Sequence, residues 1–559
     1  MRVLSSLEKL RLTFQPRLPS MLQALERLIP LFEPGGIAQG PLDHRIAHRF
    51  PQTINQTPVS FVTGDAKTHK ALRVGVVFSG GQAAGGHNII SGLYDALMKL
   101  NPESKLYGFL NGPNGIINNQ AKEIDAEILK NYRNLGGFDL LGSGRTKIET
   151  SEQFQAALKT VHGLHLDGLV IVGGDDSNTN AALLAEYFLL KNCQTRVIGT
   201  PKTIDGDLKN ASIEVSFGFD TACKTFSQTI GSILTDSLSA KKYYYFIKLM
   251  GRSASHITLE CALKCHPNLA LIGEEIAAKN LSLKAIIQSI ADLICARAEK
   301  KKNYGVILIP EGLVEFIPEI KFLIQELNAL LASAKPHLKE LDSLPKKEKI
   351  RYVAEWLTPP SKECFLFLTE EIQLQLLMER DPHGNVQVAK IETERLLIDL
   401  VKAELAIRKK DGAYTGGFSA QPLFCGYEGR SCLPSNFDCQ YCYALGHVAV
   451  LLIHTKLTGY MSCISDLHLP VEHWGIQGIP LTQMMGMEER NGELKSVVLK
   501  ALVDLTGKPF TFFAQERKKW ETEDMYCDPG PIQFFGPLAE TDQIPLTLYH
   551  ESSKNLLIV

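Results

Sequence analysis

Glycines, carboxylates and one lysine gather in three short loops, and each loop follows an apolar run. The first loop, Ser79 to Asn88, reads SGGQAAGGHN. Its glycines let backbone N–H groups approach an anion, and the start of a following helix adds a favourable dipole. The loop matches neither GxGxxG nor GxxxxGK[ST], so a purely structural strand-to-helix turn is an open alternative.

The second loop, Val172 to Ser177, reads VGGDDS and places two carboxylates side by side. Asp175 and Asp176 repel each other unless a cation or a basic group compensates them. A hard metal such as Mg²⁺, held through one aspartate and phosphate oxygens of a substrate, accounts for the pair. The alternative is that Asp176 or Ser177 caps the next helix.

The third loop, Pro201 to Asp207, reads PKTIDGD and combines one cation with two acids. Asp205 could accept the proton of an attacking hydroxyl, and Lys202 could neutralise charge that builds on a phosphate. Asp207 could help to hold a metal or orient Asp205. The alternative is a surface turn with paired charges.

Further segments offer contacts to anions and sugars. Arginine suits bidentate phosphate binding, and a glutamate at a strand end can accept hydrogen bonds from hydroxyls. These segments are Lys242-Tyr243, Met250-Gly251-Arg252, Glu311 in IPEG, and Gly426 to Arg430, which reads GYEGR.

The elements that must position these loops alternate between strands and helices. Short β-branched runs closed by glycines predict buried parallel strands, and helical segments such as 88–100 and 180–191 lie between them. The order predicts a doubly wound parallel sheet, whose ligands bind beyond the carboxyl ends of the strands. The runs are LRVGVVFSGG, LDGLVIVGGDD, TRVIGTPKT, YYYFIKLMGR and GVILIPEG.

The chain divides by pattern into four parts. Residues 1–70 form an extension with a helical spacing at Leu22, Leu25, Leu28 and Ile29. We expect a first α/β domain over 71–240 and a second over 241–317 and 411–559. Residues 318–410 interrupt the second domain; they have leucine-rich helical spacing and are interpreted as a helical insertion.

Composition excludes several classes of function. A net charge of -2 and a pI near 6.7 leave no global positive field for nucleic acid or an anionic membrane. The sequence has neither a signal peptide pattern nor an apolar run of roughly 18 residues, which predicts a cytoplasmic protein. Four grouped cysteines are interpreted as structural, because their spacing has only one CxxC, and a zinc site is the alternative. They are Cys425, Cys432, Cys439 and Cys442.

The set GGQxxGGHN, GGDDS, PKTIDGD, MGR, PEG and GYEGR closely resembles the pyrophosphate-dependent phosphofructokinases. The length, the extension and the insertion resemble the long form that plant catalytic subunits share with some bacteria and protists. The resemblance implies a phosphofructokinase-like α/β fold with two Rossmann-like domains. It also implies reversible, Mg²⁺-dependent phosphoryl transfer from pyrophosphate to the 1-hydroxyl of fructose 6-phosphate.

The resemblance also implies roles for single residues. Asp175, with Asp207, would hold Mg²⁺, and Asp205 would accept the proton of the sugar hydroxyl. Lys242 and Tyr243 would reach a neighbouring subunit's sugar site, which implies a homodimer or a higher homo-oligomer. Diphosphate contacts would come from Gly80, Gly81, Arg145 and Lys202. The fructose 6-phosphate site would contain Thr203, Ile204, Met250, Gly251, Arg252, Glu311, Tyr427, Glu428, Gly429 and Arg430.

Two positions would select the phosphoryl donor. ATP-using relatives have glycine where this chain has Asp176 and Lys202, and an aspartate there would occupy the space of a nucleotide α-phosphate. One departure is Ala84, where the family usually has proline, which frees the backbone of the first loop. The alternatives are an ATP-dependent phosphofructokinase, a non-catalytic regulatory subunit, and the NAD or lipid kinases, which lack the combination of PKTIDGD, MGR and GYEGR.

Overall fold

The computed structural model describes residues 3–32, 43–65, 69–333, 344–377, 390–490, 493–541 and 544–552. The chain forms two compact units. Unit 1 contains Met1–Thr225, Tyr427–Ala501 and Ile532–Val559, and unit 2 contains Phe226–Gly426 and Leu502–Pro531. Helix α8 (Phe219–Ala240) begins in unit 1 and ends in unit 2. The sequence-based division ended the first domain at residue 240 and placed all of 411–559 in the second. Unit 1 instead leaves the chain at Thr225 and takes up the segments that begin at Tyr427 and Ile532.

Unit 1 is built on a nine-stranded sheet with the order β1-β2-β13-β12-β7-β6-β3-β4-β5. Its centre is parallel, from β12 to β4, and its margins are antiparallel. The strands are β1 (Leu28–Phe32), β2 (Val59–Thr63), β3 (Arg73–Phe78), β4 (Lys105–Phe109), β5 (Ala121–Ile124), β6 (Gly168–Gly173), β7 (Arg196–Pro201), β12 (Tyr460–Ser465) and β13 (Gly475–Pro480).

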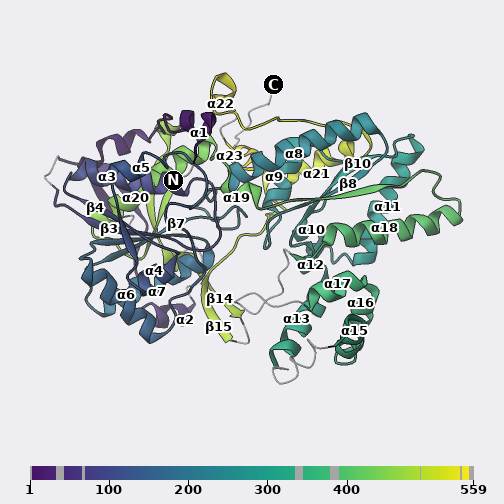
Figure 1. Ribbon diagram of the computed structural model, residues 1–559, viewed down its shortest axis with the longest axis horizontal. Coiled ribbons are helices and arrows are strands. Elements are labelled where there is room, and N and C mark those ends of the chain that lie inside the picture. Colours follow the sequence, from purple (N-terminus) through teal and green to yellow (C-terminus); the bar gives the residue numbers. More distant parts are fainter. Residues whose placement is uncertain are drawn as a thin grey trace. The chain divides into compact units, whose positions relative to one another are not determined.

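Helices cover both faces of this sheet, with α3 and α20 packed together on one side and α6 and α7 on the other (Figure 1). Apolar side chains of β3, β4, β6 and β7 are buried between these layers. The helices of unit 1 are α1 (Ser6–Arg11), η1 (Ser20–Arg27), α2 (His44–Arg49), α3 (Gly86–Leu100), α4 (Pro113–Ile117), α5 (Ala126–Leu129), α6 (Ser151–Gly163), α7 (Asp175–Leu190), α19 (Glu428–Ser431), α20 (Asn436–His454), η3 (Val471–His473), η4 (Leu481–Met484), α22 (Pro537–Thr541) and α23 (Leu546–Ser552).

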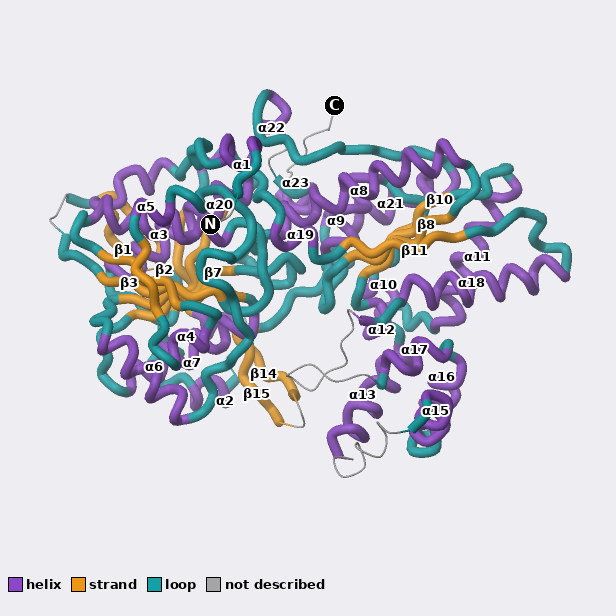
Figure 2. The backbone as a smooth tube through the Cα atoms, in the orientation of Figure 1, coloured by secondary structure: helices purple, strands orange, loops and turns teal. Residues whose placement is uncertain are grey.

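Two further strands, β14 (Met485–Arg490) and β15 (Glu493–Val498), form a separate antiparallel hairpin (Figure 2). The N-terminal extension is part of the large sheet, since β1 pairs with β2 and β2 pairs with β13. The helical prediction for Leu28 and Ile29 is therefore wrong, because both residues lie in β1. Pro30 explains the difference: it breaks a helix but is tolerated on an edge strand.

Unit 2 contains a four-stranded sheet with the order β11-β8-β10-β9. All of its strand pairs are parallel. Its elements are β8 (Tyr244–Leu249), β9 (Leu269–Ala270), β10 (Gly305–Pro310), β11 (Ala420–Cys425), α9 (His256–Cys265), α10 (Gly273–Ala278), α11 (Leu283–Glu299), α12 (Leu313–Phe316), α13 (Pro318–Ser333), α15 (Lys346–Ala354), α16 (Pro359–Phe367), α17 (Glu370–Leu376), α18 (Thr393–Lys410) and α21 (Lys508–Thr522).

The described residues between 318 and 410 form helices without a strand. Their apolar faces share one core with the sheet, because Leu323 of α13 and Leu397 of α18 belong to the same buried cluster as Ile307 of β10. Residues 334–343 and 378–389 of the predicted insertion lie outside the described residues. Within the described ranges, no helix has the length and apolar character needed to cross a lipid bilayer.

The five predicted strands are confirmed as β3, β6, β7, β8 and β10. The chain leaves β3 toward β4 on one side of the sheet, and leaves β6 toward β7 on the other side. The point between β3 and β6 is therefore a topological switch point, where α/β sheets bind their ligands. The first two chemical loops follow these two strands.

Candidate active site

The first and second loops touch at the switch point of unit 1. Ser177 Oγ donates a hydrogen bond of 2.8 Å to Ser79 Oγ. Gly80 has a φ of 88°, and its N–H donates to the carbonyl of Gly144, next to Arg145. A Cβ atom at Gly80 would lie 3.3 Å from Lys202 Nζ. The backbone conformation therefore favours glycine at this position, and the lysine ammonium lies close to it.

Lys202 is the central positive group of this site. Its backbone N–H donates to the carbonyl of Gly173, which fixes the third loop against the second. Its side chain is only 6% exposed. Burial, reinforced by the positive charge of Arg430 and opposed by Asp205, lowers the pKa of the Lys202 ammonium to about 8. The structure thus brings Lys202 together with Asp175, Asp205, Arg145 and Arg430.

Asp175 and Asp176 begin helix α7, five residues before the predicted helix segment. The N-cap residue is Gly174, which makes no side-chain capping bond, so the capping interpretation of Asp176 and Ser177 is wrong. Both carboxylates occupy the first turn, where the helix dipole favours negative charge.

Each of the two carboxylates faces its own lysine. Lys500 Nζ lies 3.5 Å from Asp175 Oδ2, and Lys147 Nζ lies 3.4 Å from Asp176 Oδ1. Sequence reasoning missed both lysines. Their positive charges compensate the repulsion between the adjacent aspartates, so the repulsion alone does not require a metal.

The third loop holds its two acids in different environments. Gly206, between them, has a φ of 73°. Asp205 is half-buried, and its N–H donates to Thr203 Oγ1 at 3.1 Å. Asp207 is buried, and burial, reinforced by the negative charge of Asp205, raises the pKa of its carboxyl to about 7 although Lys500 acts in the opposite direction. Asp205 is therefore the acid that a substrate can reach.

The donor set at Asp175 and Asp207 fits Mg²⁺. Both carboxylates converge on one cation position, because Lys500 Nζ lies 3.5 Å from Asp175 Oδ2 and 3.9 Å from Asp207 Oδ2. Among the described residues, no group of three or more His, Cys, Asp or Glu side chains could hold a metal. Mg²⁺ commonly binds through one or two carboxylates and completes its shell with phosphate oxygens and water.

The segment Tyr427 to Arg430 lies in unit 1 and ends at the first loop. A Cβ atom at Gly81 would lie 3.3 Å from Arg430 Nη1. The Arg430 guanidinium also lies 5.4 Å from the centre of the Tyr427 ring. Glu428 is exposed and Gly429 is buried. Arg430 therefore faces the same glycine loop as Lys202.

A second cluster of predicted site residues lies in unit 2, beyond the carboxyl ends of β8 and β10. Glu311 is buried, and its Oε2 accepts a hydrogen bond of 2.8 Å from the N–H of Gly251. A Cβ atom at Gly312 would lie 2.0 Å from the carbonyl oxygen of Arg252. Met250 is buried and donates its N–H to Cys425, while the side chain of Arg252 is exposed. In this cluster Arg252 is therefore exposed, while its backbone packs closely against Gly312.

Glu274 supports this second cluster and was missed in the sequence. Its Oε1 accepts hydrogen bonds of 3.0 Å from the N–H groups of Ser255 and Val503. Ser255 Oγ in turn accepts from the N–H of Gly273. No local motif points to Glu274, because its partners lie in two distant segments of the chain.

Lys242 and Tyr243 lie at the opposite end of β8 from Met250 to Arg252. The six residues of this strand span about 20 Å, so the two segments do not meet within unit 2. Lys242 Nζ instead lies 4.9 Å from the centre of the Tyr243 ring.

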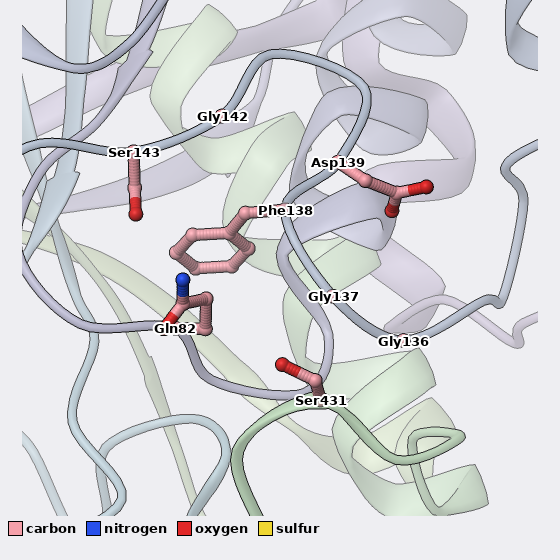
Figure 3. A pocket seen from close by; sticks show the side chains of 8 residues that line it. All are labelled: Gln82, Gly136, Gly137, Phe138, Asp139, Gly142, Ser143 and Ser431. Atoms are coloured by element: carbon pink, nitrogen blue, oxygen red, sulfur yellow. The ribbon is translucent and has the colours of Figure 1, made fainter. Parts of the chain in front are cut away.

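A pocket of about 350 Å³ opens beside the first loop of unit 1. The side chains of Gln82, Ser143 and Ser431 lie around the ring of Phe138 (Figure 3). That ring stacks on Phe78 with 3.9 Å between the ring centres. The lining contains no lysine or arginine, so a phosphate finds better charge compensation at Lys202.

The four grouped cysteines contact different partners. Cys439 and Cys442 lie on the buried helix α20, and Cys439 Sγ accepts a hydrogen bond of 3.0 Å from Arg11 Nη2. Cys432 Sγ lies 3.2 Å from Thr225 Oγ1. Cys425 ends strand β11 in unit 2. These sulfur atoms thus take part in local packing and hydrogen bonding.

Comparison with known proteins identifies the class. The family described as phosphofructokinase matches residues 73–453, a range that begins at β3 and includes all three loops. The chain therefore belongs to the phosphofructokinase family.

Individual relatives match over most of the chain. A potato protein named pyrophosphate–fructose 6-phosphate 1-phosphotransferase subunit beta is 51% identical over 540 residues, which cover 96% of this chain and 92% of the potato chain. A Treponema pallidum protein named pyrophosphate–fructose 6-phosphate 1-phosphotransferase is 51% identical over 509 residues, covering 89% of this chain and 88% of the other.

Among solved structures, the pyrophosphate-dependent phosphofructokinase of Nitrosospira multiformis aligns with a TM-score of 0.52 at 14% identity. The alignment covers 83% of this chain and 96% of that chain. This likeness supports the fold, and the predicted phosphofructokinase-like α/β architecture is confirmed.

Proposed function

We propose that this protein transfers a phosphoryl group reversibly from pyrophosphate to the 1-hydroxyl of fructose 6-phosphate, giving fructose 1,6-bisphosphate and phosphate. The observation that carries the proposal is the position of Lys202. Its buried ammonium lies beside Gly80 of the anion-binding loop and within electrostatic reach of Asp175 and Asp205. The names of the relatives support the same donor and acceptor.

In the proposed reaction, the sugar oxygen attacks the terminal phosphorus while the anhydride P–O bond breaks. Asp205 accepts the hydroxyl proton, because it is less buried than Asp207, the other acid of the third loop. Lys202 and Arg145 neutralise the charge that builds on the leaving phosphate. Mg²⁺ bound at Asp175 and Asp207 would supply further neutralisation of the diphosphate oxygens. Positioning and charge compensation therefore carry most of the rate.

Asp176 selects the donor in this proposal. Lys147 Nζ lies 3.4 Å from its carboxylate, and the side chain of Asp176 is 35% exposed, so a donor can approach it. A fixed carboxylate there excludes an α-phosphate by volume and by like charge, while a two-phosphate donor fits.

The sugar phosphate binds, in this proposal, to the cluster of unit 2 that contains Gly251, Arg252 and Glu311. Arg252 supplies a guanidinium for the 6-phosphate. Glu311 accepts a hydrogen bond from the N–H of Gly251 and in this proposal also accepts from the sugar hydroxyls.

We further propose a homodimer in the cytoplasm. Lys242 and Tyr243 lie at the far end of β8 from the sugar cluster, so their predicted role requires the sugar site of another copy. In a two-fold dimer each copy would lend this segment to its partner.

The direct test compares phosphoryl donors on the purified chain. Protein with Mg²⁺ and fructose 6-phosphate receives either pyrophosphate or ATP, and ³¹P NMR identifies the products. We expect fructose 1,6-bisphosphate and phosphate from pyrophosphate, and the reverse reaction when both products are supplied. Faster product formation from ATP would reject the donor assignment. Activity that appears only after addition of a second subunit would favour the regulatory alternative.

A further inference from the structure

Lys500 is placed at the candidate metal site by its main chain. It follows the hairpin β14–β15, and residues on both sides of it are anchored. The N–H of Leu499 donates to the carbonyl of Met484, and the N–H of Ala501 donates to the carbonyl of Asp207. The residue before them, Val498, donates its N–H to Thr179 Oγ1 of helix α7 at 2.8 Å. The lysine side chain therefore starts from a fixed point beside the second and third loops.

The ammonium of Lys500 occupies the position toward which two carboxylates converge. Its distances are 3.5 Å to Asp175 Oδ2 and 3.9 Å to Asp207 Oδ2. The side chains of Asp175 and Asp207 are only 18% and 7% exposed, so their charges need a nearby cation. A metal ion that bound both oxygens would have to enter the same space, and two cations at this distance repel each other.

We infer that Lys500 is a built-in counter-ion that neutralises Asp175 and Asp207 before a divalent cation arrives and leaves this position when one binds. The inference rests on the proposed function, because it takes Asp175 and Asp207 as the ligands of Mg²⁺. The four-carbon stem and the 28% exposure of the lysine side chain give it room to turn away.

The exchange has a consequence for the order of binding. A divalent cation without diphosphate must displace the Lys500 ammonium from its two carboxylate partners, so its net free energy of binding at this site is small. A cation that arrives with diphosphate brings anionic oxygens, and these offer the displaced ammonium a new partner. Lys500 therefore disfavours the free metal and favours the metal–diphosphate complex, which makes it a positioning residue.

The experiment measures binding of Mn²⁺, used as a probe for Mg²⁺, by the EPR signal of the unbound aqueous ion. Lys500→Met should bind Mn²⁺ alone about tenfold more tightly than the wild type, because a competing charge has been removed. The same variant should bind Mn²⁺ with methylenediphosphonate, which cannot transfer its phosphoryl group, about tenfold more weakly. A merely structural role would not move the two affinities in opposite directions.

Two lysine variants serve as controls. Lys500→Arg keeps the charge and should stay close to the wild type in both titrations. Lys495→Met removes a lysine of the same hairpin that lies opposite Glu488, and should also leave both affinities unchanged. If thermal unfolding shows that Lys500→Met is not folded normally, Lys500→Gln replaces it as the test variant. Unchanged or weaker binding of Mn²⁺ alone by the folded variants would overturn the inference.

Asp175→Asn separates this inference from the proposed function. It should abolish Mn²⁺ binding in the wild-type and Lys500→Met backgrounds alike. If it does so while Lys500→Met leaves the affinity unchanged, the metal assignment stands and the counter-ion role fails. If Asp175→Asn leaves Mn²⁺ binding intact, the metal assignment itself fails, and the role of Lys500 fails with it.

Discussion

The two clusters of site residues differ in the burial of their basic groups. In unit 1, charged groups are held in the interior, where Lys202 and Asp207 are buried and have displaced pKa values. In unit 2, a tight backbone carries the cluster, and Arg252 is exposed. Buried charges are costly, so the buried groups of unit 1 need compensation, whereas an exposed guanidinium keeps contact with water. The difference fits the proposed roles, in which the donor end is organised before binding and the acceptor end is completed by the sugar phosphate.

The largest expected effect concerns Asp205, the proposed proton acceptor of unit 1. Asp205→Asn should lower kcat by about 10²–10⁴-fold, because the amide cannot take the hydroxyl proton. The KM values for both substrates should change little, since Asn keeps the size of the side chain. Steady-state kinetics in the direction of bisphosphate formation provide the measurement. A kcat within threefold of the wild type would show that another group accepts the proton.

The buried lysine predicts a pH dependence. Lys202 is positively charged below its pKa of about 8, so kcat/KM for pyrophosphate should fall as the pH rises through this value. Lys202→Met should lose about 10²-fold in kcat and should also lose this alkaline decline. Lys202→Arg keeps its charge at high pH and should move the decline beyond pH 9, because an arginine does not titrate in this range. An unchanged decline in Lys202→Met would assign it to a different group.

A pair of glycine substitutions compares the two backbones directly. In Gly312→Ala the new Cβ would lie 2.0 Å from the carbonyl oxygen of Arg252, so the backbone must move. In Gly81→Ala the nearest atom is Arg430 Nη1 at 3.3 Å, which is the end of a flexible side chain. Gly312→Ala should raise the KM for fructose 6-phosphate about tenfold and destabilise the fold by about 1–3 kcal/mol. Gly81→Ala should leave the KM for the sugar nearly unchanged and should not measurably destabilise the fold.

Kinetics with both substrates and thermal unfolding of both variants test this pair. Equal effects of the two substitutions on the KM for the sugar would show that unit 2 does not carry the acceptor site.

The smallest expected effect tests the shared sugar site. Lys242→Ala and Arg252→Ala should each be weakly active alone. If each site takes Arg252 from one copy and the partner subunit's Lys242, a refolded equal mixture should regain about a quarter of wild-type activity, because half of the dimers are hybrids with one intact site. Activity that stays at the mean of the two variants would place both residues in the same copy or in different functions.

Local sequence patterns predicted the three loops and the strands before them. Buried strands such as β6 and β7 read as continuous β-branched runs, and glycines mark their ends. The proximity of Lys202 and Asp205 could be predicted because both residues belong to one short loop. The start of α7 was misplaced, because two acids and a serine obscured a helix that begins without a side-chain cap.

The compensating groups could not be predicted in this way. Lys147 and Lys500 reach Asp176 and Asp175 from distant segments, and Lys500 follows a hairpin outside the range that matches the family. Glu274 likewise depends on tertiary contacts. Leu28 and Ile29 had helical spacing, yet pairing with β2 determined their conformation. Such contacts are set by the assembled fold, where burial and charge outweigh local preference.

The central claim is that the charge cluster of unit 1 admits a two-phosphate donor and rejects a nucleotide. The most direct measurement is the ratio of kcat/KM for pyrophosphate to kcat/KM for ATP, in the wild type and in a variant with Asp176→Gly and Lys202→Gly. The account predicts a ratio far above one for the wild type and a fall of at least about 10²-fold in the variant, with measurable use of ATP. A wild type that uses ATP more efficiently than pyrophosphate would contradict the account.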